Sequence, residues 1–231
     1  MKIGIIGAGN IGGTLTRRLS ELGHDVSVAN SRGPHTLVDL ASATGAHNVP
    51  VEAVARRAEL VVVTIPQFRV PDLPAGIFDG AADELIVVDT GNYYPQQRDG
   101  RIDEIEDGMP ESRWVETRLK RPVIKAFNNI YAQHLSDNGL PAGTPGRIAL
   151  PVAGDDRAAR AIVMDVVDTL GFDPVAAGEI EESWRQQPGT PVYTTDKDAD
   201  GVRQALAQAS PERAPEWRAT TGSPGTFTQP A

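Results

Sequence analysis

Three glycines near the start of the chain have the spacing of a phosphate-binding turn. Gly7, Gly9 and Gly12 form a G-x-G-x-x-G sequence. In such a turn the first glycine permits a tight bend, the second lets the backbone approach a pyrophosphate, and the third lets a helix lie close on a sheet. The motif alone is a weak signal, because glycine turns are common, and a turn that binds nothing is the alternative.

The segments that flank the glycines provide the context that the motif needs. Lys2–Ile6 is a short apolar run of the kind found in buried strands. The next segment, Asn10–Leu22, carries apolar residues at helical spacing and ends before Gly23, which favours helix termination. This order predicts a dinucleotide-binding unit, with the backbone N–H groups of Asn10 and Ile11 directed at the phosphates.

The loop after a second expected strand, Asp25–Ala29, indicates which dinucleotide is bound. An Asp or Glu at this place typically holds the ribose 2′-hydroxyl of NAD, but the chain has Asn30, Ser31 and Arg32 there. A guanidinium can form charge-assisted hydrogen bonds to a 2′-phosphate. We therefore predict NADP(H) rather than NAD(H), with a solvated loop arginine as the alternative interpretation of Arg32.

The most strand-like run in the chain, Leu60–Ile65, is β-branched and unbroken up to a proline. Such a run is typical of a central parallel strand that is covered on both faces. The carboxyl ends of these strands face the ligand crevice, so Thr64, Ile65 and Pro66 are expected to line the cofactor. The side chain of Gln67 is expected to add a contact, and an ordinary strand-ending proline is the alternative.

Small polar residues also follow the next two apolar runs, Leu85–Asp89 and Pro122–Phe127. Asn92 lies shortly after the first run, and Asn128 directly follows the second. Carboxamides at these strand ends could hydrogen-bond the nicotinamide amide or a second planar ring, and Asn128 is our candidate catalytic residue. An ordinary turn before a helix at Ile130–Leu135 is the alternative.

The alternation of strands and helices predicts an α/β fold. Unbroken apolar strands indicate a Rossmann-type doubly wound parallel sheet with strand order 3-2-1-4-5-6. We assign residues 1–140 to an NADP-binding Rossmann domain. Residues 147–209 follow a linker rich in Gly and Pro and form a small C-terminal α/β region, which either extends the sheet or forms a lid. Residues 210–231 have a composition typical of a disordered tail.

Weaker patterns lie between the strands. Helical spacing predicts helices over His35–Thr44, Val51–Ala58 and Ser112–Lys120, and a short helix within Pro71–Asp79. The composition of Tyr93–Glu111 predicts a long surface loop.

Tyr193 and Lys197 have the Tyr-x-x-x-Lys spacing that short-chain dehydrogenases place on one face of a long helix. Pro188 and Pro191 precede the motif, and the two threonines within it disfavour a helix. We therefore do not expect this motif to be catalytic. The aromatic and polar residues of Gly178–Thr195 suit a binding edge or a dimer contact.

Composition excludes several classes of function. The chain has 231 residues, a net charge of -9, four histidines and no cysteine. The negative charge argues against a general nucleic-acid binder, and the lack of cysteine excludes disulfides and thiolate metal sites. No metal site is expected, because the histidines form no ligand-spaced pair.

No apolar run reaches the ~20 residues of a membrane span, and the chain starts in a core strand, so we expect a cytoplasmic protein without a membrane partner.

Three segments together resemble a known family. Met1–Arg32, Val62–Pro66 and Val152–Asp156 are similar to the NADP oxidoreductases that depend on the 8-hydroxy-5-deazaflavin coenzyme, and the similarity covers most of Met1–Trp184. The resemblance implies that the loop at Ser31 and Arg32 receives the 2′-phosphate. It also implies that the wall at Ile65 and Pro66 adjoins the nicotinamide, and that the donor and acceptor rings meet face to face without a dedicated protein acid.

Two segments depart from that family. Asn128 stands where the deazaflavin enzymes tend to have a histidine, and Gln186–Gln208 replaces the helices near the deazaflavin. Lys125–Asn128 is instead similar to the NADPH-binding domain of six-transmembrane metalloreductases, which pass hydride to a flavin.

The sequence therefore predicts an NADP-dependent oxidoreductase that places NADP(H) against a deazaflavin or a flavin, FMN or FAD, as co-substrate. Catalysis would rest on orientation and on exclusion of water. We expect a homodimer. The alternatives are an NADP(H)-binding sensor without turnover and a reductase of a small imine or carbonyl substrate, for which the sequence shows no proton donor at a strand end.

Overall fold

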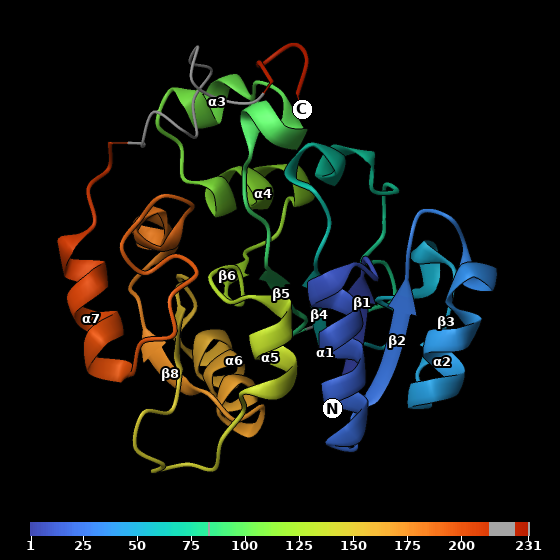
Figure 1. Ribbon diagram of the computed structural model, residues 1–231. Coiled ribbons are helices and arrows are strands. Elements are labelled where there is room, and N and C mark those ends of the chain that lie inside the picture. The colour runs from blue at the N-terminus through green and yellow to red at the C-terminus, as the bar shows by residue number, and fades with distance from the viewer. Residues whose placement is uncertain (83, 213–224, 231) are drawn as a thin grey trace.

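A parallel six-stranded sheet forms the centre of the protein (Figure 1). This computed structural model of the protein describes residues 1–82, 84–212 and 225–230. The strand order is β3-β2-β1-β4-β5-β6, as predicted for a Rossmann-type doubly wound sheet. The strands are β1 (Lys2–Ile6), β2 (Asp25–Ala29), β3 (His47–Asn48), β4 (Leu60–Val63), β5 (Ile86–Asp89) and β6 (Ile124–Lys125). Much of the segment 210–231 lies outside the described residues, so its expected disorder stays a prediction.

Apolar side chains of the central strands are buried on both faces of the sheet. In β4, Leu60 and Val62 join one buried cluster, whereas Val61 and Val63 join the other. One face is covered by α1 (Asn10–Glu21), α2 (Val38–Thr44), α5 (Ala132–Asp137) and α6 (Arg157–Thr169), and the other by α4 (Glu111–Leu119) and short 3₁₀ segments. Burial on both sides explains why the strand is a continuous apolar run in the sequence.

Two of the expected helices are wrong. Val51–Ala58 forms only a 3₁₀ turn at Val51–Ala53, and Arg57 has a φ of 60°, which no right-handed helix accommodates. Within Pro71–Asp79 the helical turn lies earlier, as a 3₁₀ segment at Gln67–Asp72. Short apolar spacing does not distinguish a single turn from a full helix.

The excursion Tyr93–Glu111 is not the plain surface loop that its composition predicts. It contains a π-helical turn at Pro95–Asp99 and the short helix α3 (Asp103–Glu106). The Asp99 carboxylate is buried and accepts the backbone N–H of Tyr94 at 2.7 Å. The buried polar Asp99 is accommodated because its carboxylate is hydrogen-bonded within the same segment.

The C-terminal region forms a small sheet of its own. Strands β7 (Ala149–Val152) and β8 (Asp173–Ala176) pair in parallel, and α7 (Ala199–Gln208) packs against them. In the described part of the chain, one isolated bridge joins this sheet to the large one, through Lys125 N–H to Ala153 O at 2.8 Å and Ala153 N–H to Lys125 O at 3.1 Å. The C-terminal strands therefore form a separate sheet and do not extend the large one. The other expected arrangement, a lid, stays a prediction.

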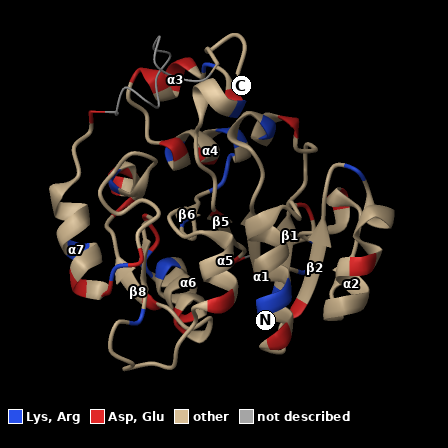
Figure 2. Ribbon diagram, in the orientation of Figure 1, with Lys and Arg blue, Asp and Glu red and all other residues tan. Residues whose placement is uncertain are grey.

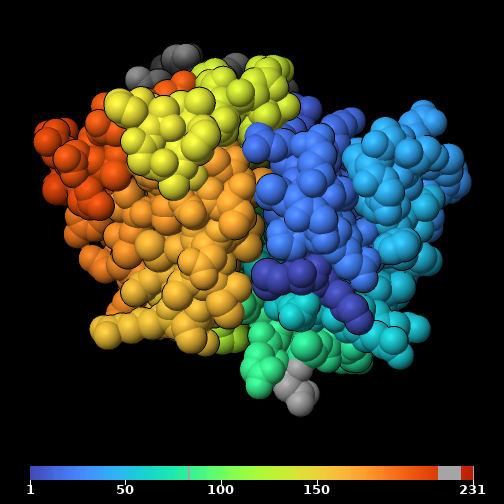
Figure 3. All heavy atoms as spheres, turned by 90° about the horizontal axis from the view of Figure 1, so that it is seen from below, coloured from blue at the N-terminus to red at the C-terminus, as the bar shows by residue number. Residues whose placement is uncertain are grey.

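The two regions are in close contact. Figure 3 shows the C-terminal residues packed directly against the N-terminal ones along one face of the molecule. The Arg18 guanidinium on α1 donates hydrogen bonds to the carbonyls of Leu135, Ser136 and Leu170 at 3.0, 2.7 and 2.9 Å. In the described part of the chain, no helix combines the length and the apolar character needed to cross a membrane.

Candidate cofactor site at the carboxyl ends of the strands

The three glycines of the turn after β1 differ in what surrounds them. A Cβ added to Gly7, whose φ is 104°, would lie 2.4 Å from the carbonyl oxygen of Thr64. One added to Gly12 would lie 1.9 Å from the carbonyl oxygen of Gly7. At Gly9 nothing lies within 4 Å. The fold itself therefore requires Gly7 and Gly12, whereas the open space at Gly9 suits the close approach of a ligand.

The N-terminus of α1 is open beside this turn. Gly9 is its N-cap residue, no described side chain caps it, and its first turn contains no acidic residue. The first N–H groups of an α-helix have no partner within the helix, and they carry a partial positive charge. Those of Asn10 and Ile11 are thus suited to bind an anion, as the pyrophosphate of a dinucleotide requires.

A cavity of about 480 Å³ lies over the turn, at the carboxyl ends of β1, β4, β5 and β6. Its lining includes the predicted residues Gly9, Asn10, Ile11, Thr64, Ile65, Pro66, Asn92 and Asn128. Thr90 and Gly91 also line it. The sheet topology thus brings together residues that are far apart in the sequence, as the strand-end reasoning predicts.

The residues expected to bind a 2′-phosphate lie outside this cavity, on the loop after β2. The Oδ1 atom of Asn30 accepts the backbone N–H of Arg32 at 2.9 Å, and its Nδ2 atom donates to the hydroxyl of Thr36 at 2.9 Å. Ser31 and Arg32 are exposed, and Arg32 forms no salt bridge with any described residue. Figure 2 shows the basic segment of this loop between β2 and α2. Asn30 therefore shapes the loop, and the Arg32 guanidinium is free to meet an anion.

Gln67 does not contact the cavity, and the expectation of a cofactor contact there is wrong. Its side chain is fully buried, and Nε2 donates to the carbonyl of Glu111 at 2.9 Å. After Pro66 the chain enters a 3₁₀ segment, which turns this side chain toward the interior.

Asn128 is held by the protein on both ends of its carboxamide. The Nδ2 atom donates to Asn92 Oδ1 at 3.0 Å and to the Gln186 carbonyl at 2.6 Å, while Oδ1 accepts from Gln186 Nε2 at 3.0 Å. Asn92 Nδ2 in turn donates to the backbone carbonyl of Asn128 at 2.9 Å. This network fixes the orientation of Asn92, which is only partly buried, at the cavity wall.

We expect Asn128→Ala to lower the free energy of unfolding by about 1–3 kcal/mol, because Gln186 loses buried hydrogen bonds. It should slow hydride transfer more than it weakens NADPH binding, because Asn92 loses its fixed orientation. Stopped-flow rates and NADPH titration measure the two effects. An unchanged rate would return Asn128 to the role of an ordinary turn residue.

Several cavity residues were not assigned to the cofactor site from the sequence, although Tyr193 and Thr194 belong to Gly178–Thr195, the segment expected to form a binding edge or a dimer contact. Tyr94, Arg98, Tyr131, Tyr193 and Thr194 all line the cavity, and the hydroxyls of Tyr94 and Tyr193 are hydrogen-bonded to each other. The Tyr-x-x-x-Lys spacing pointed to Tyr193, but the helix that this motif requires is not formed. Lys197 does not line the cavity.

Two cavity residues have strained backbone conformations. Phe127 has a φ of 61° and Thr194 a φ of 52°, in the left-handed region that bulky and β-branched residues rarely adopt. The N–H of Thr194 donates to the carbonyl of Asn129 at 2.9 Å, which holds this conformation. Such strain is concentrated at functional sites in proteins.

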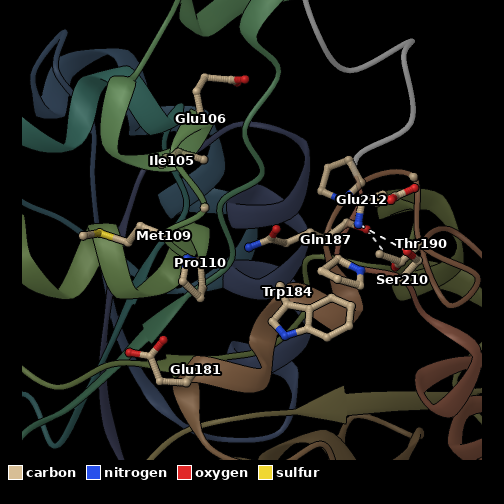
Figure 4. Close-up of a pocket in the computed structure, with 14 residues that line it drawn as sticks. Ile105, Glu106, Met109, Pro110, Glu181, Trp184, Gln187, Thr190, Ser210 and Glu212 are labelled. Carbon is tan, nitrogen blue, oxygen red and sulfur yellow. Dashed lines mark hydrogen bonds between the residues drawn. The ribbon is translucent and has the colours of Figure 1, made fainter.

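A second cavity, of about 330 Å³, lies beside the 3₁₀ segment Ile180–Gln186 (Figure 4). Met109 and Trp184 line it together with the acidic side chains of Glu181 and Glu212. None of the predicted cofactor residues does so. Part of Gly178–Thr195, the segment expected to form a binding edge or a dimer contact, therefore lines this second cavity.

Comparison with known proteins finds a family match in the N-terminal part of the chain. Residues 2–93 match the family described as NADP oxidoreductase, coenzyme F420-dependent, which confirms the resemblance to deazaflavin-dependent enzymes. Protein YjhV of Escherichia coli K12 is 43% identical over 93 residues, which are 40% of this chain and 61% of that protein. Erythronate-4-phosphate dehydrogenase of Salinibacter ruber is 41% identical over 64 residues, 28% of this chain and 16% of that enzyme. The chain thus spans less than two thirds of these relatives.

Solved structures support the same fold over a longer stretch. The hypothetical protein SMa0349 of Sinorhizobium meliloti superposes with a TM-score of 0.71 at 27% identity, over 85% of this chain and 94% of that one. A protein of Arthrobacter sp. FB24 with a proposed F420-dependent NADP reductase activity gives 0.63 at 26% identity, over 78% and 86%. The enzyme class predicted from the sequence, an NADP-dependent oxidoreductase, agrees with the matched family and with the second of these structures.

Proposed function

We propose that this chain, whose residues 2–93 match the F420-dependent NADP oxidoreductases, transfers hydride between NADP(H) and a deazaflavin or flavin coenzyme. The main support is the open space at Gly9 beside an uncapped helix N-terminus, at the edge of a cavity of about 480 Å³. A phosphate bound at that turn leaves the rest of the cavity for a nicotinamide and an acceptor ring. That this enzyme works as a cytoplasmic homodimer stays a prediction.

The walls of the cavity would contribute to catalysis by orienting the rings. One part of the cavity wall is apolar and can exclude water from a planar ring. It is formed by Ile65, Pro66, Phe127 and Ile130. Asn92, fixed by Asn128, presents an amide that can hydrogen-bond a carboxamide. When bound, the nicotinamide supplies the hydride. The protein would hold donor and acceptor in reacting geometry.

NADP(H) is the dinucleotide favoured by the loop after β2. Arg32→Ala is expected to weaken NADPH binding by about 1.5–3 kcal/mol, the range for hydrogen bonds to charged groups, and to leave NADH binding nearly unchanged. Fluorescence titration of the two cofactors measures this difference.

Arg203→Ala provides a matched control for this charge change. Arg203 is exposed on α7 and pairs with Asp200, so its removal should affect neither cofactor. Equal losses for NADPH and NADH with Arg32→Ala would contradict the 2′-phosphate assignment.

The function itself is tested by NADPH oxidation with an 8-hydroxy-5-deazaflavin as acceptor, with FMN and FAD assayed in parallel. Rapid oxidation with the deazaflavin alone would establish the family activity. Oxidation with a flavin alone would identify a flavin reductase. Tight NADPH binding without oxidation of any acceptor would favour the sensor.

Reduction of a small imine or carbonyl is the second candidate. The sequence offered no proton donor for this reaction, but the cavity contains the hydroxyl pair of Tyr94 and Tyr193. This pair is the observation that favours the second candidate, and a small cyclic imine therefore belongs in the acceptor panel.

A further inference from the structure

Two tyrosine hydroxyls meet in the wall of the cofactor cavity. Tyr94 follows β5, whereas Tyr193 comes from the C-terminal region, and their Oη atoms are hydrogen-bonded. Both side chains line the cavity that contains the glycine turn at Gly9. An acceptor placed against the nicotinamide would therefore share its cavity with this pair.

Tyr94 is held in a fixed position by its neighbours. Its backbone N–H donates to Asp99 Oδ2 at 2.7 Å. Arg98 donates to both carboxylate oxygens of Asp99, at 3.0 and 2.9 Å, and its guanidinium carbon lies 5.0 Å from the centre of the Tyr94 ring. A cation over the ring favours a negative charge on the phenol oxygen.

Tyr193 is also anchored through its backbone. Its N–H donates to the Thr190 carbonyl at 3.0 Å, and the N–H of Thr194 donates to the Asn129 carbonyl at 2.9 Å. Asn129 belongs to the turn after β6, so this hydrogen bond ties the C-terminal segment to the edge of the large sheet. The left-handed φ of Thr194, 52°, is part of this arrangement.

The cavity offers few other proton donors. Among the described residues that line it there is no Asp, Glu, His or Lys. Arg98 is too weak an acid, and so are the amides and the aliphatic hydroxyls. Tyr131 lies at an exposed place, with 54% of its surface accessible. Among the described residues that line the cavity, the part-buried hydroxyls of Tyr94 and Tyr193 are therefore the groups best placed to act as a general acid.

Burial raises the pKa of both tyrosines, so both are protonated near neutral pH. The pKa of Tyr94 is lowered in part by the hydrogen bond from Tyr193 and by the charge of Arg98, against the opposite effects of Glu111 and Asp99. For Tyr193, burial and then the proximity of Tyr94 both raise the pKa. The position of the Arg98 guanidinium over the ring of Tyr94 distinguishes the two hydroxyls, because a cation there stabilises the phenolate that remains after proton donation.

We propose that Tyr94 is the proton donor to the hydride acceptor and that Tyr193 is the positioning residue that holds its hydroxyl. This inference rests on the proposed hydride transfer from NADPH. It also names the class of acceptor, one that takes a hydride at one atom and a proton at a nitrogen or oxygen conjugated with it. Imines, carbonyls, deazaflavins and flavins all belong to this class.

The step is balanced in atoms and electrons. The acceptor gains a hydride with its electron pair from NADPH, which is oxidised to NADP⁺. The π bond of the acceptor breaks toward its nitrogen or oxygen, and that atom forms a bond to the Tyr94 proton. The electron pair of the O–H bond stays on Tyr94 as a phenolate, which accepts a hydrogen bond from Tyr193 and regains a proton from solvent.

The test compares Tyr94→Phe, Tyr193→Phe and Tyr93→Phe in H₂O and D₂O. Tyr93 is the matched control, because it is the neighbouring residue, is buried, and uses its hydroxyl to accept the Ile102 N–H at 3.0 Å outside the cavity. NADPH oxidation is measured with an 8-hydroxy-5-deazaflavin, FMN, FAD and a small cyclic imine. NADPH binding is titrated separately.

For Tyr94→Phe we expect kcat to fall by about 100-fold, within the range of general acid catalysis, with NADPH binding nearly unchanged. The solvent isotope effect of the native protein should be lost in this variant. Tyr193→Phe should lower kcat less and keep the isotope effect, and Tyr93→Phe should keep the native rate and isotope effect.

Three outcomes overturn the inference, and they are distinguishable. If the native protein oxidises NADPH with some acceptor and Tyr94→Phe matches it in rate and isotope effect, the proton donor is wrong and the proposed function stands. If Tyr93→Phe loses as much as Tyr94→Phe, the effect is structural. If the native protein binds NADPH but reduces no acceptor, the proposed function and the proton donor both fail.

Discussion

Lys125→Met is expected to lower the free energy of unfolding by about 3–5 kcal/mol, because it leaves a buried carboxylate without its partner. The side chains of Lys125 and Asp89 are 0% and 1% exposed, and Nζ lies 3.2 Å from Oδ2. Lys125 also donates to the carbonyl of Gly91. Urea unfolding followed by tryptophan fluorescence measures the loss.

The double variant Asp89→Asn with Lys125→Met is the control for charge. Asp89 Oδ1 accepts the N–H of Gly91 at 2.8 Å, and Oδ2 accepts the hydroxyl of Ser112 at 2.6 Å. An asparagine can keep the first bond with its oxygen and donate to the Ser112 hydroxyl oxygen with its amide group. The double variant should therefore be more stable than Lys125→Met alone, since no unpaired charge stays buried. A loss of less than ~1 kcal/mol for Lys125→Met would show that the carboxylate finds another partner or is neutral.

This ion pair also supports the candidate site. Asp89 is the last residue of β5 and Lys125 the last of β6, so the pair joins the two strand ends that lead to Asn92 and Asn128. Gly91, which contacts both members of the pair, lines the cavity. The buried charges therefore lie directly beneath the polar wall that would orient a nicotinamide, and a fixed wall is what catalysis by orientation requires.

The sequence was most informative where a local pattern has one structural meaning. The strands expected at Lys2–Ile6 and Asp25–Ala29 coincide with β1 and β2. The apolar residues of β1 are buried, as its continuous apolar run indicates, and in β2 the apolar Val26, Val28 and Ala29 are buried. β3 escaped detection because His47 and Asn48 are polar and two residues carry no periodicity. Its existence followed only from the strand order that the family of folds requires.

The residues of the candidate site also differ in how far a local pattern predicts them. Residues at strand ends were predicted, because parallel topology alone brings carboxyl ends together. Tyr94 and Tyr193 were missed as a pair, since their contact depends on tertiary features that the sequence does not display. The π-helical turn at Pro95–Asp99 and the left-handed backbone at Thr194 are two of these features.

Gly9→Val is expected to weaken NADP(H) binding by about 100-fold, equivalent to about 2.7 kcal/mol, with little change in stability. A Cβ at this position meets no atom within 4 Å, so the fold has room for the side chain. The branched side chain would instead occupy the space through which a pyrophosphate approaches the N-terminus of α1. NADPH titration and urea unfolding of the same preparation separate the two effects.

The neighbouring glycines provide controls with opposite expectations. A Cβ at Gly13 would lie 3.5 Å from Arg17 Nη1, so Gly13→Ala should bind NADPH normally and gain up to ~1 kcal/mol of helix stability. At Gly12 the clash with the Gly7 carbonyl should destabilise the fold itself. Native NADPH affinity in Gly9→Val would place the pyrophosphate elsewhere, and the proposed hydride transfer would then lose its main support.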